Sequence, residues 1–180
     1  METQVGGVTL ECVRGDITRQ EGFDAVVNAA NAELMPGGGV AGAIHRAAGP
    51  KLAEECRPLA PIKPGDAVIT SGQLMSNPYI IHCLGPVYGM DEPSDVLLAN
   101  CYRNALRLAA EKGLAAVAFP ALSTGAFGYP MEPAAETALQ TVLETIPELT
   151  NVRRIRFVLL GASDLDTHTA VLERLTGGQG

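Results

Sequence analysis

Residues 25–49 read AVVNAANAELMPGGGVAGAIHRAAG, which places a short apolar run, a glycine-rich loop and a helical pattern in immediate succession. The apolar run is typical of a strand that is covered on both faces. Beyond the glycines, Ile44, Ala48 and Leu52 recur four residues apart, which predicts one buried helix face. A strand, a loop and a helix in this order indicate an α/β domain.

The rest of the chain repeats this alternation. Six strands are predicted, at 8–13, 25–28, 67–70, 79–83, 115–120 and 155–160. Further helices are predicted after Ser94 as an N-cap up to Gly113, from a first turn that contains Pro133 up to Pro147, and from about 166 to 175. No repeat or linker interrupts the pattern, so we expect one domain over residues 1–180, with 177–180 as a frayed tail.

Composition narrows the class of ligand. With 47% hydrophobic and 18% charged residues the chain is typical of a globular protein. Since its net charge is -7, the chain lacks the basic surface that nucleic acids and anionic membranes require, and neither is an expected partner. An anionic ligand would therefore have to be held by backbone N–H groups.

The cysteines and the N-terminal sequence indicate in which cellular compartment the protein is expected. Cys12, Cys56, Cys83 and Cys101 are widely spaced and form no C-x-x-C pair, so neither a zinc site nor a disulfide framework is predicted. We expect free, mostly buried thiols in a reducing environment. Since the sequence has no signal-peptide pattern and no run of 18 apolar residues, we expect a cytoplasmic protein.

Two loops depart from ordinary turn composition, and both follow a predicted buried strand and precede a helix. Residues 27–40 contain three consecutive glycines, and residues 123–130 read STGAFGYP. Glycines at a helix N-terminus let the backbone approach an anion closely, and Ser123, Thr124 and the amides after them could form a second cradle. The alternative is that both are mobile loops in which glycine serves only the turn.

Gly37, Gly39 and Gly42 match the motif G-x-G-x-x-G, which is typical of a Rossmann dinucleotide-binding site. Its context is wrong, because that motif begins directly at a strand end and is followed by an acidic residue about 20 positions on. Several residues separate Asn28 from Gly37, and the later segment reads PIKP at 61–64. A P-loop and a G-x-S-x-G motif are both absent from the sequence.

Single polar residues carry weaker signals. Asp16, taken alone, fits a turn or helix cap better than a binding role. Asn28 and Asn31 flank a strand end, where buried asparagines more often tie loops together than take part in chemistry.

Each of the three histidines has its own expectation. His82 lies inside an apolar strand and is expected to brace the core. His168 is expected to face solvent on a helix, and for His45 a core role and a functional role remain equally open.

The chain carries GDIT at 15–18, NAAN at 28–31, GGGVAGAIHRAAG at 37–49, IIHCLGPVY at 80–88 and PALSTGAFGYP at 120–130. Taken together, these segments closely resemble the macrodomain family, in order and over almost the whole chain. The resemblance implies a three-layer α/β/α sandwich around a mixed sheet of about six strands. It also implies an ADP-ribose cleft along the crest of the sheet.

The resemblance also implies roles for individual residues. Asp16 would accept a hydrogen bond from the adenine N6 amine, and the backbone of Ile17 would contact the adenine edge. Asn28 and Asn31 would face the distal ribose, with Asn31 as the catalytic candidate that orients a water. The residues that would surround this ribose and the diphosphate are Gly37, Gly38, Gly39, Val40, Ser123, Thr124, Gly125, Ala126 and Phe127.

Two positions depart from the pattern of many relatives. Macrodomain hydrolases of the MacroD type read G-V-D-G where this chain has Ala41, and that aspartate is taken to help activate water. The G-V-A-G form resembles viral and some archaeal-type members, several of which still remove ADP-ribose. At Leu160 many relatives place an aromatic ring against adenine, whereas leucine offers apolar contact without stacking.

The resemblance favours a protein that binds ADP-ribose and hydrolyses it from ADP-ribosylated proteins or from O-acetyl-ADP-ribose, with no metal or redox cofactor. The alternative is a non-catalytic module that binds ADP-ribose marks and leaves them intact, which Ala41 favours. A nicotinamide-dependent oxidoreductase rests on the G-x-G-x-x-G match alone.

Overall fold

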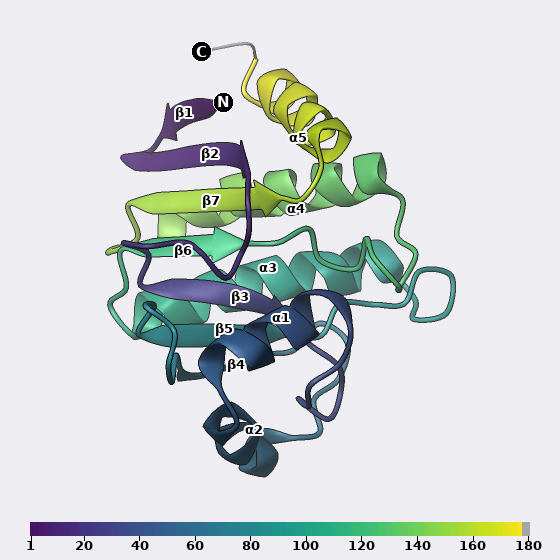
Figure 1. The fold of residues 1–180 in the computed structure, drawn as a ribbon. Helices are drawn as coiled ribbons and strands as arrows, with labels where there is room; N and C mark the ends of the chain where they lie inside the picture. The colour runs from purple at the N-terminus through teal and green to yellow at the C-terminus, as the bar shows by residue number, and fades with distance from the viewer. Residues whose placement is uncertain (178–180) are drawn as a thin grey trace.

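The computed structural model describes residues 1–177, in which a seven-stranded sheet lies between two layers of helices (Figure 1). The strands are β1 (Glu2–Val5), β2 (Val8–Arg14), β3 (Ala25–Ala29), β4 (Ala67–Ser71), β5 (Tyr79–Cys83), β6 (Ala116–Phe119) and β7 (Arg154–Leu159). Their order across the sheet is β1-β2-β7-β6-β3-β5-β4. The strands β2, β7, β6, β3 and β5 are parallel, and the edge strands β1 and β4 are antiparallel to their neighbours.

The helices are α1 (Gly39–Ala48), α2 (Lys51–Cys56), α3 (Ser94–Glu111), α4 (Met131–Thr145) and α5 (Ala162–Leu175), with short 3-10 turns at Arg57–Leu59 and Ile146–Glu148. Ile44 of α1 and Leu52 of α2 belong to one apolar cluster, and residues of α3, α4 and α5 belong to a second. Figure 1 accordingly shows α1 on one face of the sheet and α3 and α4 on the other. This confirms the predicted α/β/α sandwich with a mixed sheet.

The strand β1 is not among the strands predicted from the sequence. Its residues, ETQV, alternate between exposed and half-buried positions, so they form no apolar run. The strand is created by a hairpin with β2, in which Gly6 and Gly7 adopt positive φ angles of 54° and 80°. Glycine adopts such angles without strain, and the tight turn depends on it.

Two helix starts differ from the prediction. Ser94 is the first residue of α3 rather than its N-cap, which is Pro93, and its hydroxyl donates to the carbonyl oxygen of Asp91 at 2.6 Å. The helix α5 begins at Ala162, four residues earlier than expected. The four cysteines are free and buried, as predicted.

His168 was expected to face solvent, and the structure shows the opposite. Its side chain is buried on α5, where Nδ1 lies 2.9 Å from the carbonyl oxygen of Asp164 and the ring packs against Phe157. Over residues 1–177, no helix combines the length and the apolar character that crossing a membrane would require. Of the tail expected at 177–180, residues 178–180 lie outside the described part of the chain.

Candidate functional site

A cleft of about 810 Å³ opens at the carboxyl ends of the parallel strands. Open α/β sheets bind ligands at this edge, and this volume lies in the range of small-molecule sites. Loops that leave β2, β3, β6 and β7 contribute its walls. Of the candidate residues, those that line it are Asp16, Ile17, Asn31, Gly37, Gly38, Gly39, Val40, Ser123, Thr124, Gly125, Ala126, Phe127 and Leu160.

The first wall is the glycine-rich loop and the first turn of α1. Gly38 is the N-cap of this helix, and Gly39 has a positive φ of 55°. The N–H groups of a first helical turn have no acceptor within the helix, and the helix dipole favours an anion at that end. The loop is held in shape by Asn31, which accepts from the N–H of Met35 at 3.0 Å and donates to its carbonyl oxygen at 2.8 Å.

The second wall is the loop that follows β6. Ser123 has a positive φ of 67°, which a non-glycine residue rarely adopts, and its buried hydroxyl has no partner among the described residues. The loop closes on itself, because the N–H of Tyr129 donates to the carbonyl oxygen of Ser123 at 2.9 Å. Between these points, the N–H groups of residues 125–127 make no hydrogen bond within the described chain and remain available to an anion.

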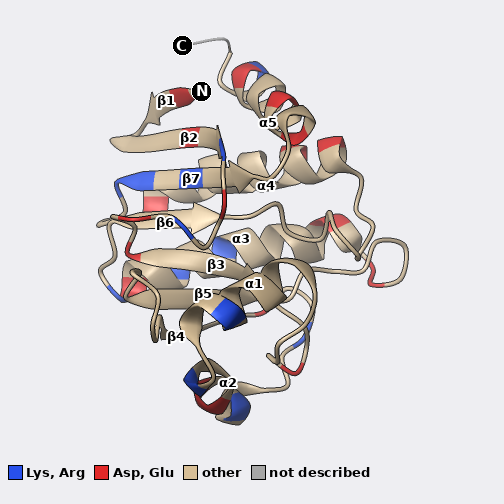
Figure 2. Ribbon diagram, viewed as in Figure 1, with Lys and Arg blue, Asp and Glu red and all other residues tan. Residues whose placement is uncertain are grey.

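Charge in the cleft agrees with anion binding through the backbone. Among the described residues, its lining contains two carboxylates, Asp16 and Asp164, and no lysine or arginine. In Figure 2 the ribbon of the loop after β6 and of the first turn of α1 is tan, the colour of uncharged residues. Asp164 is not among the predicted site residues, because the helix predicted from about 166 begins two residues beyond it.

One end of the cleft combines apolar side chains with Asp16. Ile17, Val158 and Leu160 line it, and the side chain of Leu160 is exposed. Asp16 Oδ1 accepts hydrogen bonds from the hydroxyl and the N–H of Thr18, which lower the pKa of the Asp16 carboxyl. The turn role expected of Asp16 is therefore present, while Oδ2, 4.0 Å from Arg19, lacks a hydrogen bond to any described residue and can accept from a ligand.

Asn28 does not reach the cleft, contrary to the role implied by the resemblance. It is 1% exposed, and its Nδ2 donates to Nδ1 of His82 at 3.0 Å. His82 Nε2 in turn lies 2.9 Å from the hydroxyl of Thr70. Asn28 of β3 and His82 of β5 are register partners, so their bond braces two neighbouring strands of the sheet. His82 has the core role that the sequence predicted.

His45, whose role the sequence left open, is buried on α1 and is absent from the lining of the cleft. Its Nε2 has no partner within the described residues, and burial lowers the pKa of its ring. The structure therefore favours a core position for His45.

Comparisons with known proteins agree with this geometry. The Macro domain family model matches residues 27–138. A Macro domain-containing protein of Chlorobaculum tepidum is 45% identical over 166 residues, which cover 92% of this chain and 96% of that protein. The chain belongs to the Macro domain family.

Two solved structures extend the likeness to the whole fold of this macrodomain. The Oceanobacillus iheyensis macrodomain with ADP superposes with a TM-score of 0.94 at 40% identity, covering 98% of this chain and 96% of that one. The Trypanosoma brucei macrodomain in complex with ADP-ribose superposes with a TM-score of 0.83 at 35% identity, covering 89% of this chain and 68% of that one.

Gly42 of the macrodomain is the residue at which the first turn of α1 packs closely against the glycine-rich loop. An alanine inside a helix normally stabilises it by about 1 kcal/mol relative to glycine, but a Cβ at this position would lie 2.3 Å from the carbonyl oxygen of Gly37. We expect Gly42→Ala to displace the Gly37 backbone and to lower the free energy of unfolding by about 1–3 kcal/mol. Urea denaturation measures this.

The matched control is Gly38→Ala, because Gly38 is exposed, has a φ of -86° and has no described atom within 4 Å of an added Cβ. The free energy of unfolding should fall by only about 0.5 kcal/mol, because an N-cap position tolerates glycine better than alanine. A Gly42→Ala protein as stable as the wild type would show that the Gly37 loop can move aside without loss of folding free energy.

Proposed function

We propose that this macrodomain binds ADP-ribose along the cleft. The observation that carries the proposal is the order of the chemical groups along the cleft. A carboxylate with apolar side chains lies at one end, two glycine-containing loops lie in the middle, and Asn31 lies beside the glycine loop. Support also comes from the similar structures that hold ADP and ADP-ribose.

The proposed pose follows from what each part of the cleft can recognise. Adenine lies between Ile17 and Leu160, with its N6 amine donating to Asp16. The diphosphate lies at the start of α1 and against the free N–H groups of residues 125–127, which explains how a protein of net charge -7 holds an anion. The distal ribose lies beside Asn31, and Phe127 bounds its pocket.

The proposed activity is hydrolysis of ADP-ribose from ADP-ribosylated proteins or from O-acetyl-ADP-ribose. A water beside the distal ribose is oriented by Asn31 and by a phosphate of the substrate, while the loop amides hold the diphosphate. No metal or redox cofactor enters this scheme.

A second candidate function is a binding module that retains ADP-ribose marks without cleaving them. Ala41 favours it, because this first-turn position of α1 lines the cleft and carries no carboxylate that could activate water. The two functions differ in one observable, the release of free ADP-ribose from acceptors joined through Asp or Glu, Ser or Arg.

Ligand selectivity tests the binding proposal directly. ADP-ribose should bind more tightly than AMP or NAD, because only ADP-ribose presents both a diphosphate and a free distal ribose to the two loops. Titration calorimetry with the three ligands measures the difference. If NAD binds as tightly as ADP-ribose, the distal ribose does not occupy the pocket beside Asn31 and the pose is wrong.

A further inference from the structure

The loop that carries Asp16 is joined to the sheet by the N–H of Gly15, which donates to the carbonyl oxygen of Leu159 at 2.9 Å, and by the side chain of a buried glutamine. Gln20 is 5% exposed, and its Nε2 donates to the carbonyl oxygen of Asp16 at 2.7 Å. At the other end of the same amide, Oε1 accepts from Nη1 of Arg156 at 2.9 Å. The amide therefore links the backbone of Asp16 to a side chain of β7.

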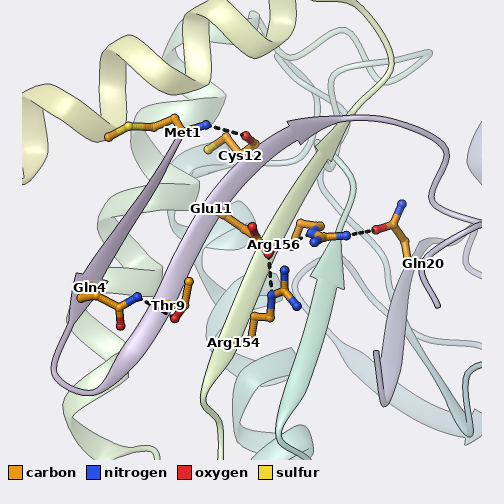
Figure 3. A network of polar contacts seen from close by, with 8 residues as sticks. All are labelled: Met1, Gln4, Thr9, Glu11, Cys12, Gln20, Arg154 and Arg156. Atoms are coloured by element: carbon orange, nitrogen blue, oxygen red, sulfur yellow. Dashed lines mark hydrogen bonds and ion pairs between the residues drawn. The ribbon is translucent and has the colours of Figure 1, made fainter. Parts of the chain in front are cut away.

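Arg156 is itself held rigidly (Figure 3). Its Nε donates to Oε1 of Glu11 at 2.9 Å, and Nε of Arg154 donates to the same oxygen at 2.7 Å. The guanidinium carbon of Arg156 also lies 4.5 Å from the centre of the Phe23 ring. Bonds between charged groups are stronger than neutral ones, and the planar guanidinium has several donors in fixed directions.

Glu11 keeps its charge in this setting. Burial raises the pKa of the Glu11 carboxyl, but the hydrogen bonds and charges of Arg154 and Arg156 outweigh burial and bring the pKa below its ordinary value. The anchor of Gln20 is thus a buried carboxylate with two guanidinium groups, which keeps Arg156 in one orientation.

The backbone around Gln20 has a separate support. Nδ2 of Asn77 donates to the carbonyl oxygens of Gln20 and Phe23, at 2.8 and 2.9 Å. The exit of the loop is therefore fixed without the Gln20 side chain. The side chain fixes only the part of the loop that contains Asp16.

We propose that Gln20 is a positioning residue for adenine recognition, which holds the Asp16 carboxylate in the cleft through Arg156 and Glu11. The inference rests on the proposed binding of ADP-ribose. Oδ1 of Asp16 is tied to Thr18, so the carboxylate turns with its own backbone. The Asp16 carbonyl accepts from the N–H of Arg19 within the turn, at 3.0 Å, and from the Gln20 amide, which is its link to β7.

The same strand also supplies the facing wall. Val158 follows Arg156 by two residues on β7 and lines the apolar end of the cleft. Residues two apart on a strand point to the same face. Arg156 therefore fixes the Asp16 carboxylate relative to the surface on which adenine rests, and this sets the distance between the ring and its acceptor.

The decisive variant is Gln20→Glu, which keeps the length of the side chain and an oxygen that can accept from Arg156. It replaces the N–H that donates to the Asp16 carbonyl with an oxygen that repels it. The ligands are ADP-ribose and an analogue with unsubstituted purine in place of adenine, which lacks the N6 amine. Calorimetry gives the ratio of their dissociation constants, which is the adenine preference.

Wild type should prefer ADP-ribose, and Asp16→Ala should abolish the preference. Gln20→Glu should lower the preference by about fivefold, as expected for the loss of one well-aligned hydrogen bond, while binding of the purine analogue changes less than about twofold. The control is Gln4→Glu, the same change at a glutamine on β1 whose Nε2 donates to the Thr9 hydroxyl at the surface. It should leave both constants unchanged.

The possible results distinguish the positioning role of Gln20 from the binding of ADP-ribose itself. A preference in Gln20→Glu equal to that of wild type overturns the positioning role, and so does an equal weakening of both ligands, which indicates general loosening of the cleft. If Gln20→Glu does not fold, Gln20→Met takes its place, because it has similar volume and lacks both hydrogen bonds. A wild-type protein that binds neither ligand contradicts the proposed function itself.

Discussion

Asn31→Ala is expected to lower the release of ADP-ribose from an ADP-ribosylated acceptor by about 100-fold, because misplacing a positioned reactant has effects of this size. The affinity for ADP-ribose should fall by much less, about tenfold or under, since the contact that matters most forms in the transition state. Some affinity is lost because the amide of Asn31 also holds the Met35 backbone.

Single-turnover assays on acceptors with each linkage measure the rate, and calorimetry measures the affinity. Asn151→Ala removes an exposed amide away from the cleft and serves as the matched control. Equal rates for wild type and Asn31→Ala would remove Asn31 from the mechanism. If the wild type releases no ADP-ribose from any linkage, the chain is a binding module.

Ala41→Asp belongs to the same experiment. A carboxylate in the first turn of α1 is favoured by the helix dipole, and this position lines the cleft. Turnover should rise, while affinity for ADP-ribose falls because the new charge lies near the diphosphate. A rate that stays at the wild-type level would show that the missing aspartate does not limit hydrolysis here.

Mild acid is expected to destabilise the protein strongly, and His82 is the main reason. Burial, with the nearby charge of His45, lowers the pKa of His82 to about 3. Its stabilising contribution is complete above the unfolded pKa of 6.5 and is lost as the pH falls toward the folded pKa. Each pH unit in this window removes about 1.4 kcal/mol, so the loss between pH 6.5 and about pH 4 is roughly 3 kcal/mol.

The hydrogen bonds of His82 explain why it resists protonation. Nδ1 accepts from Asn28, so the proton of the neutral ring lies on Nε2, which donates to Thr70. A second proton on Nδ1 would face the amide N–H of Asn28. Burial also lowers the pKa of His45 and of His168, which adds to the loss in the same direction.

Urea unfolding at several pH values between 7.5 and 4 measures this loss. His82→Gln lacks the titrating ring, so its stability at pH 7.5 should be lower but its dependence on pH weaker by about one proton. The same slope in the variant and the wild type would mean that His82 does not supply the acid sensitivity.

Local sequence determined most of the elements and the place of the candidate site. Apolar runs mark the five parallel strands and β4, and the spacing of Ile44, Ala48 and Leu52 marks the first helices, because burial acts on neighbouring residues with a fixed period. The glycine loop and residues 123–130 were both assigned to strand ends, and the structure brings them to opposite walls of one cleft. Parallel strands have their carboxyl ends at one edge, so loops that follow such strands meet at that edge.

Only the tertiary structure decided which way single polar side chains point and what they meet. Asn28 and Asn31 are three residues apart in one motif, yet Asn28 bonds to His82 on the neighbouring strand β5 while Asn31 lines the cleft. His168 is buried because α5 turns that face toward Phe157. Gln20 acquires its role from Arg156, 136 residues away in the chain, and such partners have no local pattern because packing, not sequence spacing, brings them within hydrogen-bond distance.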